Sequence, residues 1–195
     1  MPQGEDERVT AQRVGKLILV LGGARSGKSS FAQRLARHLG GDDVLYVATA
    51  EAGDDEMRQR ISQHRRERPV TWRTLEVAQR VGDSIMARAP DRGVVLIDCL
   101  TLLISNAMLA SGGDEAASRE VASVLEACRH STATFIVVSN EVGLGLVPDN
   151  RLGRRYRDVL GRANQELAVV ADNVYLMVAG LPLELRASPF LPGAE

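Results

Sequence analysis

Residues 16–29 read KLILVLGGARSGKS, an apolar segment that runs directly into a glycine-rich one. The apolar part, Lys16 to Leu21, is rich in leucine, isoleucine and valine and is typical of a buried β-strand. Gly22 to Ser29 fits the pattern G-x-x-x-x-G-K-[ST], in which glycines let consecutive backbone N–H groups point inward at a phosphate chain. Ser29 to Leu39 then shows helical spacing of apolar residues. The segment therefore has the strand–loop–helix context that phosphate binding at a helix N-terminus requires.

Each part of this phosphate loop has a chemical role. Lys28 would contact the β- and γ-phosphates, and the Ser29 hydroxyl would bind Mg²⁺. Val94 to Ile97 is another clear apolar strand, and it ends at Asp98, a carboxylate placed to contact Mg²⁺ or its water. We predict a site for a nucleoside triphosphate with Mg²⁺, in which Lys28 is catalytic and Ser29 and Asp98 are metal ligands. The loop residues are Gly22, Gly23, Ala24, Arg25, Ser26, Gly27, Lys28 and Ser29.

Apolar strand-like runs alternate with amphipathic helical segments through most of the chain. Further strands are predicted at 44–48, 71–75, 134–139 and 174–178, and further helices at 54–68, 77–88, 102–109, 115–129 and 153–171. Strands that are apolar on both faces and separated by helices indicate a parallel sheet covered on both sides. The prediction is a three-layer α/β fold of the P-loop NTPase type with a mostly parallel sheet. We expect a single catalytic domain at 15–180, a flexible extension at 1–14 and a loose tail at 181–195.

Composition excludes several classes of protein. The 195 residues include 24 Lys+Arg and 25 Asp+Glu, so the net charge of −1 gives no overall attraction to nucleic acid. No apolar stretch approaches the roughly 18 residues that a membrane span needs, and the polar N-terminus is unlike a secretory signal. Cys99 and Cys128 lie in apolar runs without zinc-ligand spacing, which predicts buried thiols. A cytoplasmic enzyme or binding protein is expected.

His64 lies in a basic segment, RISQHRRER at 60–68. Nearby positive charges favour the neutral, nucleophilic form of imidazole, and the same arginines could hold a triphosphate. A solvated basic helix face explains the same residues, so the segment alone leaves both interpretations open. His38 and His130 lie at the ends of predicted helices, where a cation simply stabilises the helix.

Several short segments follow the phosphate loop in a specific order. They are YVATA (46–50), DDEM (54–57), RI and HR (60–65), RP (68–69), WRTLE (72–76), DCLT (98–101), SNEVGLGLVPDNRL (139–152), and RD with GRANQ (157–165). With the loop, this set resembles the bifunctional adenosylcobinamide kinase / adenosylcobinamide-phosphate guanylyltransferase family of cobalamin biosynthesis, over about residues 16–180.

The resemblance implies two reactions. A kinase step would move the γ-phosphoryl group of ATP or GTP onto adenosylcobinamide. A transferase step would attach GMP from GTP to a histidine and pass it to adenosylcobinamide phosphate; by motif position that histidine is His64. The family's nucleotide contacts correspond to the phosphate loop and to Ala48, Thr49, Ala50, Arg65, Arg66, Glu67, Arg68, Glu76 and Asp98. The resemblance also implies a homo-oligomer, a trimer in relatives.

Other functions stay open on the residues alone. One is a P-loop small-molecule kinase with a single activity, for which His64 is dispensable. Another is a GTP-binding regulatory protein, although no N-K-x-D guanine motif is present; a purely structural nucleotide-binding subunit is a third. We expect the Glu76 carboxylate to select guanine by accepting hydrogen bonds from N1 and the exocyclic amine. We expect residues 140–152, just after a predicted strand end, to contact the corrinoid or another subunit, unless they form only a glycine-rich connection.

Overall fold

The computed structural model describes residues 15–51, 55–88 and 93–185, which contain one seven-stranded sheet. The strands are β1 (Leu17–Gly22), β2 (Val44–Ala48), β3 (Arg73–Glu76), β4 (Val94–Asp98), β5 (Thr134–Val138), β6 (Asn173–Val178) and β7 (Leu181–Leu185). Their order is β3-β2-β4-β5-β1-β6-β7. Every neighbouring pair is parallel except β6–β7. The mostly parallel sheet confirms the predicted α/β fold.

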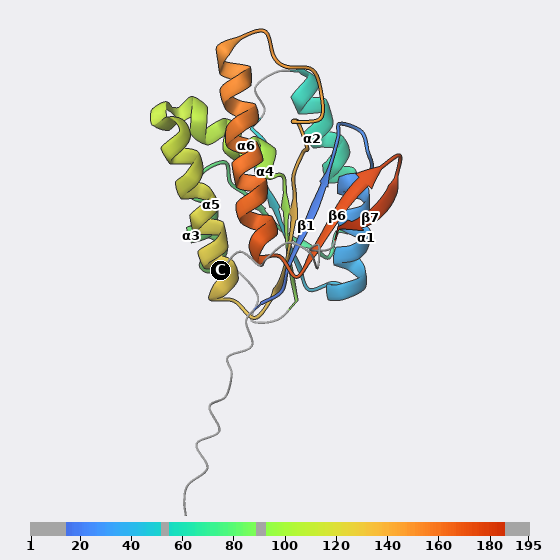
Figure 1. The fold of residues 1–195 in the computed structure, drawn as a ribbon. Coiled ribbons are helices and arrows are strands. Elements are labelled where there is room, and N and C mark those ends of the chain that lie inside the picture. The colour runs from blue at the N-terminus through green and yellow to red at the C-terminus, as the bar shows by residue number, and fades with distance from the viewer. Residues whose placement is uncertain (1–14, 52–54, 89–92, 186–195) are drawn as a thin grey trace, which may run out of the picture.

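The helices cover both faces of this sheet (Figure 1). They are α1 (Lys28–Gly40), α2 (Asp55–Glu67), α3 (Val81–Met86), α4 (Leu100–Ala107), the π-helix η1 (Met108–Gly112), α5 (Gly113–Arg129) and α6 (Arg151–Val170). Because strand side chains alternate between faces, Leu19 and Val137 pack with α3 to α6, whereas Val20 and Val138 pack with α1. Both faces are therefore buried, as the continuous apolar runs predicted.

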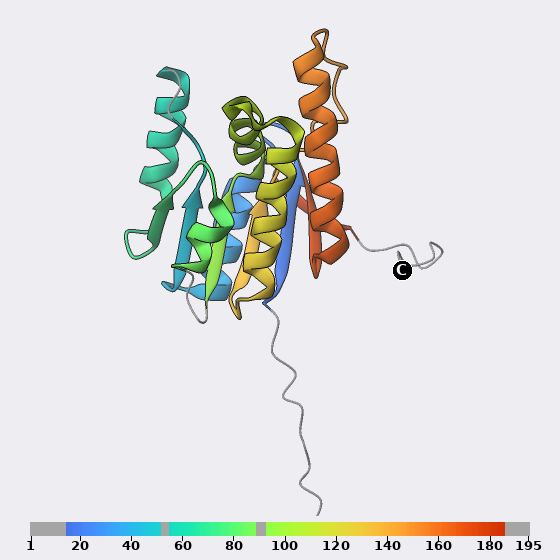
Figure 2. The same ribbon diagram turned by 90° about the vertical axis from the view of Figure 1, so that its left-hand side faces the viewer.

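The connections bring the predicted site residues to one edge of the sheet. The loop after β1, the end of β4 and the end of β2 all lie at the carboxyl ends of parallel strands, and α2 stands beyond this edge (Figure 2). The strand that ends in Asp98 is separated from β1 by β5. A ligand on the phosphate loop therefore meets side chains from three separate strands, as is usual for open α/β sheets.

The structure corrects two of the expected elements. Residues 181–185 were expected in a loose tail, but they form β7, which pairs antiparallel with β6. The helix expected at 77–88 is confined to Val81–Met86, since Val77 N–H still bonds the carbonyl of Ala48 and Arg80 has a left-handed φ of 53°. The expected extensions at 1–14 and 186–195 lie outside the described residues. Among the described helices, none combines the length and the apolar character needed to cross a membrane.

Candidate active site

The phosphate loop is a compact turn between β1 and α1. Lys28 reaches back over the loop and its Nζ donates to the carbonyl of Gly23 at 2.5 Å. Gly27, at the start of α1, has a φ of 91°, a conformation that side chains disfavour. A Cβ on Gly22 would lie 2.7 Å from the backbone carbonyl oxygen of Met177 on β6, so the close approach of the strands also requires glycine there. The ammonium group and the N-terminal end of α1 thus meet at one place, as anion binding needs.

Asp98 connects the phosphate loop to the rest of the site. Its Oδ1 accepts from Ser29 Oγ at 3.2 Å, and its Oδ2 accepts from Tyr46 Oη at 2.5 Å. With bonds of about 2.1 Å, neighbouring ligands of an octahedral Mg²⁺ lie about 3 Å apart, so Ser29 Oγ and Asp98 Oδ1 fit adjacent positions. The described side chains form no cluster of three acidic, histidine or cysteine ligands. This arrangement fits an ion that takes its remaining ligands from water and phosphate oxygens.

His64 approaches the same carboxylate from α2. Its Nδ1 lies 3.8 Å from Asp98 Oδ2, and this nitrogen is buried without a hydrogen-bond partner, although 35 % of the His64 side chain is exposed. Arg68 follows on the same side, with its guanidinium carbon 3.7 Å from the centre of the Tyr46 ring. Burial and the neighbouring Asp98 raise the pKa of Tyr46 well above its ordinary value, so its hydroxyl remains a donor.

These groups line one cleft with a volume of about 1180 Å³. From the predicted set it includes Ala24, Arg25, Ser26, Gly27, Lys28, Ser29, Ala48, Ala50, His64, Arg65, Arg68, Glu76 and Asp98. Arginine and lysine outnumber carboxylates among the described lining residues, which favours an anionic ligand. Arg65 Nη2 donates to Glu76 Oε1 at 2.5 Å on the rim of the cleft. The cleft is therefore basic at the phosphate loop and has an acidic residue within its rim.

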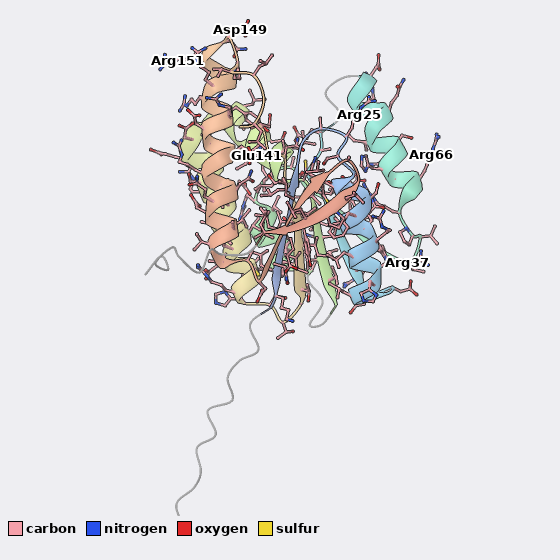
Figure 3. All side chains as sticks on the ribbon, turned by 45° about the vertical axis from the view of Figure 1, so that its right-hand side comes forward. Arg25, Arg37, Arg66, Glu141, Asp149 and Arg151 are labelled. Carbon is pink, nitrogen blue, oxygen red and sulfur yellow. The ribbon has the colours of Figure 1, made fainter. Side chains whose placement is uncertain are left out.

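Some residues that were predicted to contact the nucleotide do not line the cleft. The Thr49 side chain is fully buried, and its Oγ1 donates to the carbonyl of Cys99 at 2.7 Å and accepts from its N–H at 3.0 Å. This hydroxyl holds the segment after β4 instead of facing the cleft. Arg66 projects from α2 away from the sheet and is not among the lining residues (Figure 3). The side chain of Glu67 lies outside the described residues. Gly22 and Gly23 shape the loop without lining the cleft.

Several lining residues were not predicted as site residues. They include Tyr46, Cys99 and Thr101, together with Arg58, Gln59, Ile61 and Ser62 of α2. A tyrosine within an otherwise aliphatic strand is a usable signal, because a buried phenol needs a hydrogen-bond partner. Burial and the neighbouring Asp98 raise the pKa of the Cys99 thiol to about 11, so Cys99 is protonated at neutral pH.

Residues 139–150 connect β5 to α6 and form an arch at the top of the molecule (Figure 1), and Asn140 near its start lines the cleft. Asn140 is anchored: its N–H donates to Thr101 Oγ1 and its carbonyl accepts from the buried Asn164. Further along, Leu144, Leu146 and Val147 are exposed. Asn150 then caps α6 by accepting from the N–H of Gly153 at 2.7 Å. The segment is thus anchored at both ends and carries exposed apolar side chains between them. Its expected contact with a corrinoid or another subunit stays a prediction.

Comparisons with known proteins agree on one family. Residues 18–185 match the family described as cobinamide kinase / cobinamide phosphate guanyltransferase. The chain is 41 % identical over 184 residues to the bifunctional adenosylcobalamin biosynthesis protein CobU of Escherichia coli (strain K12), covering 87 % of this chain and 99 % of the relative. It is 43 % identical over 171 residues to the bifunctional adenosylcobalamin biosynthesis protein CobP of Pseudomonas aeruginosa, covering 88 % and 98 %.

Solved structures agree on the fold. An ATPase from the type III secretion system of pathogenic bacteria aligns with a TM-score of 0.53 at 15 % identity, covering 84 % of this chain and 51 % of that chain. At this identity the likeness concerns the α/β nucleotide-binding fold alone.

Proposed function

The chain belongs to the cobinamide kinase / cobinamide phosphate guanyltransferase family, and from this we propose that it catalyses both reactions in one cleft. The kinase step phosphorylates adenosylcobinamide with ATP or GTP. The transferase step moves GMP from GTP, through a GMP–histidine intermediate on His64, to adenosylcobinamide phosphate. The observation that carries the proposal is the position of His64, which lines the same cleft as Lys28 and lies beside Asp98.

In the kinase step, the phosphate loop holds the triphosphate and Lys28 stabilises charge on the transferred γ-phosphoryl group. Lys28 is 8 % exposed, so its ammonium group acts in a poorly solvated place where electrostatic interactions are strong. Ser29 and Asp98 would hold Mg²⁺, which when bound would offset the negative charge of the phosphates. The acceptor hydroxyl displaces the nucleoside diphosphate and takes the γ-phosphoryl group.

In the transferase step, a lone pair of the neutral His64 imidazole attacks the α-phosphorus. The bond from the α-phosphorus to the bridging oxygen breaks, and its electron pair leaves with pyrophosphate, whose charge Lys28 and the loop amides stabilise. The phosphate of the acceptor then attacks the same phosphorus and the electron pair of the N–P bond returns to the imidazole. One difficult displacement is thus divided into two easier ones.

Base selection falls to Glu76 in this proposal. Its carboxylate lies on the rim of the cleft and accepts from Arg65. Each carboxylate oxygen has two lone pairs, so the carboxylate can accept from Arg65 and from guanine N1 and its exocyclic amine at once. Adenine lacks both donors at these positions, which would restrict the transferase step to GTP.

A single-activity kinase and a GTP-binding regulator are the competing functions. Neither explains why a histidine with a buried Nδ1 faces the carboxylate at the end of β4. We also propose a cytoplasmic enzyme without nucleic-acid partners, and a homotrimer on the basis of the family resemblance.

The decisive experiment uses GTP labelled at the α-phosphorus, incubated with Mg²⁺ and the protein and then denatured. Wild type is expected to retain label that is lost in acid and stable in alkali, the behaviour of a phosphoramidate. His64→Ala is expected to retain none, whereas His38→Ala, which changes a histidine at the end of α1, is expected to label like wild type.

A second label, on the γ-phosphorus of ATP, follows the kinase step in the same preparations. His64→Ala is expected to phosphorylate adenosylcobinamide at the wild-type rate. An unlabelled wild type that still phosphorylates adenosylcobinamide would leave a kinase alone. Retention of α-label by His64→Ala would place the intermediate on another residue.

A further inference from the structure

We propose that Tyr46 is a positioning residue for guanylyl transfer: through Asp98 it holds His64 in the tautomer that carries its proton on Nδ1 and leaves Nε2 free to attack. This inference rests on the proposed function, because it concerns the same histidine. It adds a residue of β2 that contacts neither the phosphate loop nor the imidazole in any hydrogen bond that the structure shows.

The first support is the way in which Asp98 is held. Tyr46 is 1 % exposed, and its hydroxyl donates to Asp98 Oδ2 at 2.5 Å, while Ser29 donates to Oδ1 at 3.2 Å. Both carboxylate oxygens therefore have a donor, from two different elements of the fold. A carboxylate fixed at both oxygens has little freedom to rotate, so its direction toward α2 is set before a nucleotide binds.

The second support is the environment of His64 Nδ1. This nitrogen is buried and has no hydrogen-bond partner, and Asp98 Oδ2 lies 3.8 Å from it. A buried polar nitrogen without a partner is unusual and requires a physical reason. Catalytic hydrogen bonds are often long without substrate and shorten in the complex, so we interpret the 3.8 Å gap as this bond before nucleotide binding.

Tautomerism then determines the reaction. A neutral imidazole has one protonated and one free nitrogen, and the hydrogen bond made by one nitrogen decides which is which. If Nδ1–H donates to Asp98, the lone pair is on Nε2. Because Nδ1 is shielded while about a third of the side chain is accessible, Nε2 is the nitrogen that a nucleotide in the cleft can reach.

The charges of the transfer step are consistent with this tautomer. When Nε2 forms its bond to the α-phosphorus and pyrophosphate leaves, the ring gains positive charge while Nδ1 keeps its proton. The negatively charged Asp98 carboxylate stabilises that positive charge, as the aspartate does in a Ser-His-Asp triad. When the acceptor takes GMP, the electron pair of the N–P bond returns to Nε2 and the same tautomer is restored.

The Tyr46 hydroxyl has a role beyond packing in the core. Phenylalanine would occupy the same space on β2, but it would leave Asp98 Oδ2 without its donor. The guanidinium of Arg68 lies over the ring at 3.7 Å, so the phenol is held on one face as well as at its hydroxyl.

The first test measures the tautomer directly, without any reaction. Because the bond is inferred to close only in the complex, the full-length protein is saturated with Mg²⁺ and a GTP analogue that carries a methylene group in place of the oxygen between its α- and β-phosphorus. Nitrogen-15 NMR at about pH 8.5, where an ordinary histidine is neutral, then reports which ring nitrogen carries hydrogen. With three histidines in the chain, the His64 signals are assigned from their loss in His64→Gln. Wild type is expected to show hydrogen on Nδ1 of His64, and Tyr46→Phe a shift of most of the population to Nε2. An Nε2–H tautomer in wild type, or no change in Tyr46→Phe, would overturn the proposal.

The second test measures a single turnover of labelled protein from α-labelled GTP. In Tyr46→Phe the rate at saturating GTP is expected to fall about tenfold or more, with an unchanged half-saturating concentration of GTP. The matched control is Tyr156→Phe, which removes the hydroxyl of a less buried tyrosine that does not line the cleft and that donates to the carbonyl of Thr101 at 3.1 Å. The control is expected to keep the wild-type rate.

The two tests distinguish a failure of this inference from a failure of the proposed function. Equal rates in Tyr46→Phe and wild type would refute a positioning role for Tyr46 while leaving the GMP–histidine intermediate in place. Absence of labelled wild-type protein would refute the intermediate, and the tautomer measured by NMR would still decide whether Tyr46 and Asp98 orient His64.

Discussion

Replacing Thr49 by valine tests whether this residue is structural or contacts the nucleotide. The Thr49 side chain is fully buried, and its hydroxyl makes two hydrogen bonds, to the carbonyl and to the N–H of Cys99. Valine has nearly the same shape but no hydroxyl, so the Cys99 N–H loses its partner, whereas the Cys99 carbonyl keeps the N–H of Leu103 at 3.3 Å. Orphaning the buried N–H costs about 1–3 kcal/mol and losing the second hydrogen bond about 1 kcal/mol, so Thr49→Val is expected to lower the free energy of unfolding by about 2–4 kcal/mol.

Urea unfolding followed by circular dichroism measures this loss. With a slope of about 2 kcal/mol per molar urea, the midpoint is expected to fall by about 1–2 M. Thr49→Ser is the matched control: it keeps the hydroxyl and removes one methyl group, for a loss of about 1 kcal/mol. Equal midpoints for the valine and serine variants would refute the structural role. A stable valine variant with weakened GTP binding would instead restore Thr49 as a nucleotide contact.

Three further predictions test the site and the core. Glu76→Gln is expected to raise the half-saturating concentration of GTP about tenfold in GMP transfer and to leave use of ATP in the kinase step unchanged; unaltered GTP kinetics would contradict its role in base selection. Burial and Asp98 disfavour the Cys99 thiolate and raise the pKa of this thiol to about 11 from 9.0. In a Cys128→Ser background, alkylation of Cys99 at pH 9 is therefore expected to be about 50-fold slower than that of an ordinary thiol. Its rate is expected to keep rising about tenfold per pH unit up to pH 10, and levelling near pH 9 would show an unperturbed thiol. A Cβ on Gly82 would lie 2.2 Å from a backbone carbonyl oxygen of α5, so Gly82→Ala is expected to destabilise the protein by more than about 2 kcal/mol in thermal unfolding. Gly161→Ala, with nothing near its Cβ inside α6, is the control and is expected to be neutral or stabilising by up to about 1 kcal/mol.

The parts of the fold that were predicted correctly depend on local signals. The phosphate loop, its strand and its helix are contiguous in the chain, so composition and spacing suffice to place them. Asp98 was placed correctly at the edge of the sheet because the end of an apolar run marks the end of a strand. These signals need no knowledge of which segments meet in space.

The elements that differ from their predicted bounds depend on contacts between segments that are distant in the sequence. The N-terminal end of α3 receives its acceptor from Glu120 of α5, whose carboxylate accepts from the N–H groups of Arg80 and Val81. A helix start capped by another helix leaves no signature in its own sequence. The strand β7 follows a two-residue turn, Ala179-Gly180, with positive φ at both positions. Such turns usually carry asparagine or aspartate first, so the hairpin signal was weak.

Within the site, the phosphate loop and its pairing with Asp98 through Ser29 were predicted, but the approach of Tyr46 and His64 to Asp98 was not. Tyr46 belongs to β2 and His64 to α2, and only the sheet order brings both to the end of β4. The family resemblance assigns positions to a ligand without saying which atoms face it. For this reason Thr49 was expected in the cleft although its side chain holds Cys99.

In the proposed function, the two oxygens of Asp98 explain why one cleft can serve two reactions. Oδ1 faces Ser29 and the phosphate loop, where a γ-phosphoryl group is transferred, and Oδ2 faces Tyr46 and His64, where an α-phosphorus is attacked. The two phosphorus atoms belong to one triphosphate chain and are only two bridging oxygens apart. A single carboxylate between the ammonium-bearing loop and the imidazole can therefore orient both sets of groups. This geometry needs no second nucleotide site in the part of the chain that the structure describes.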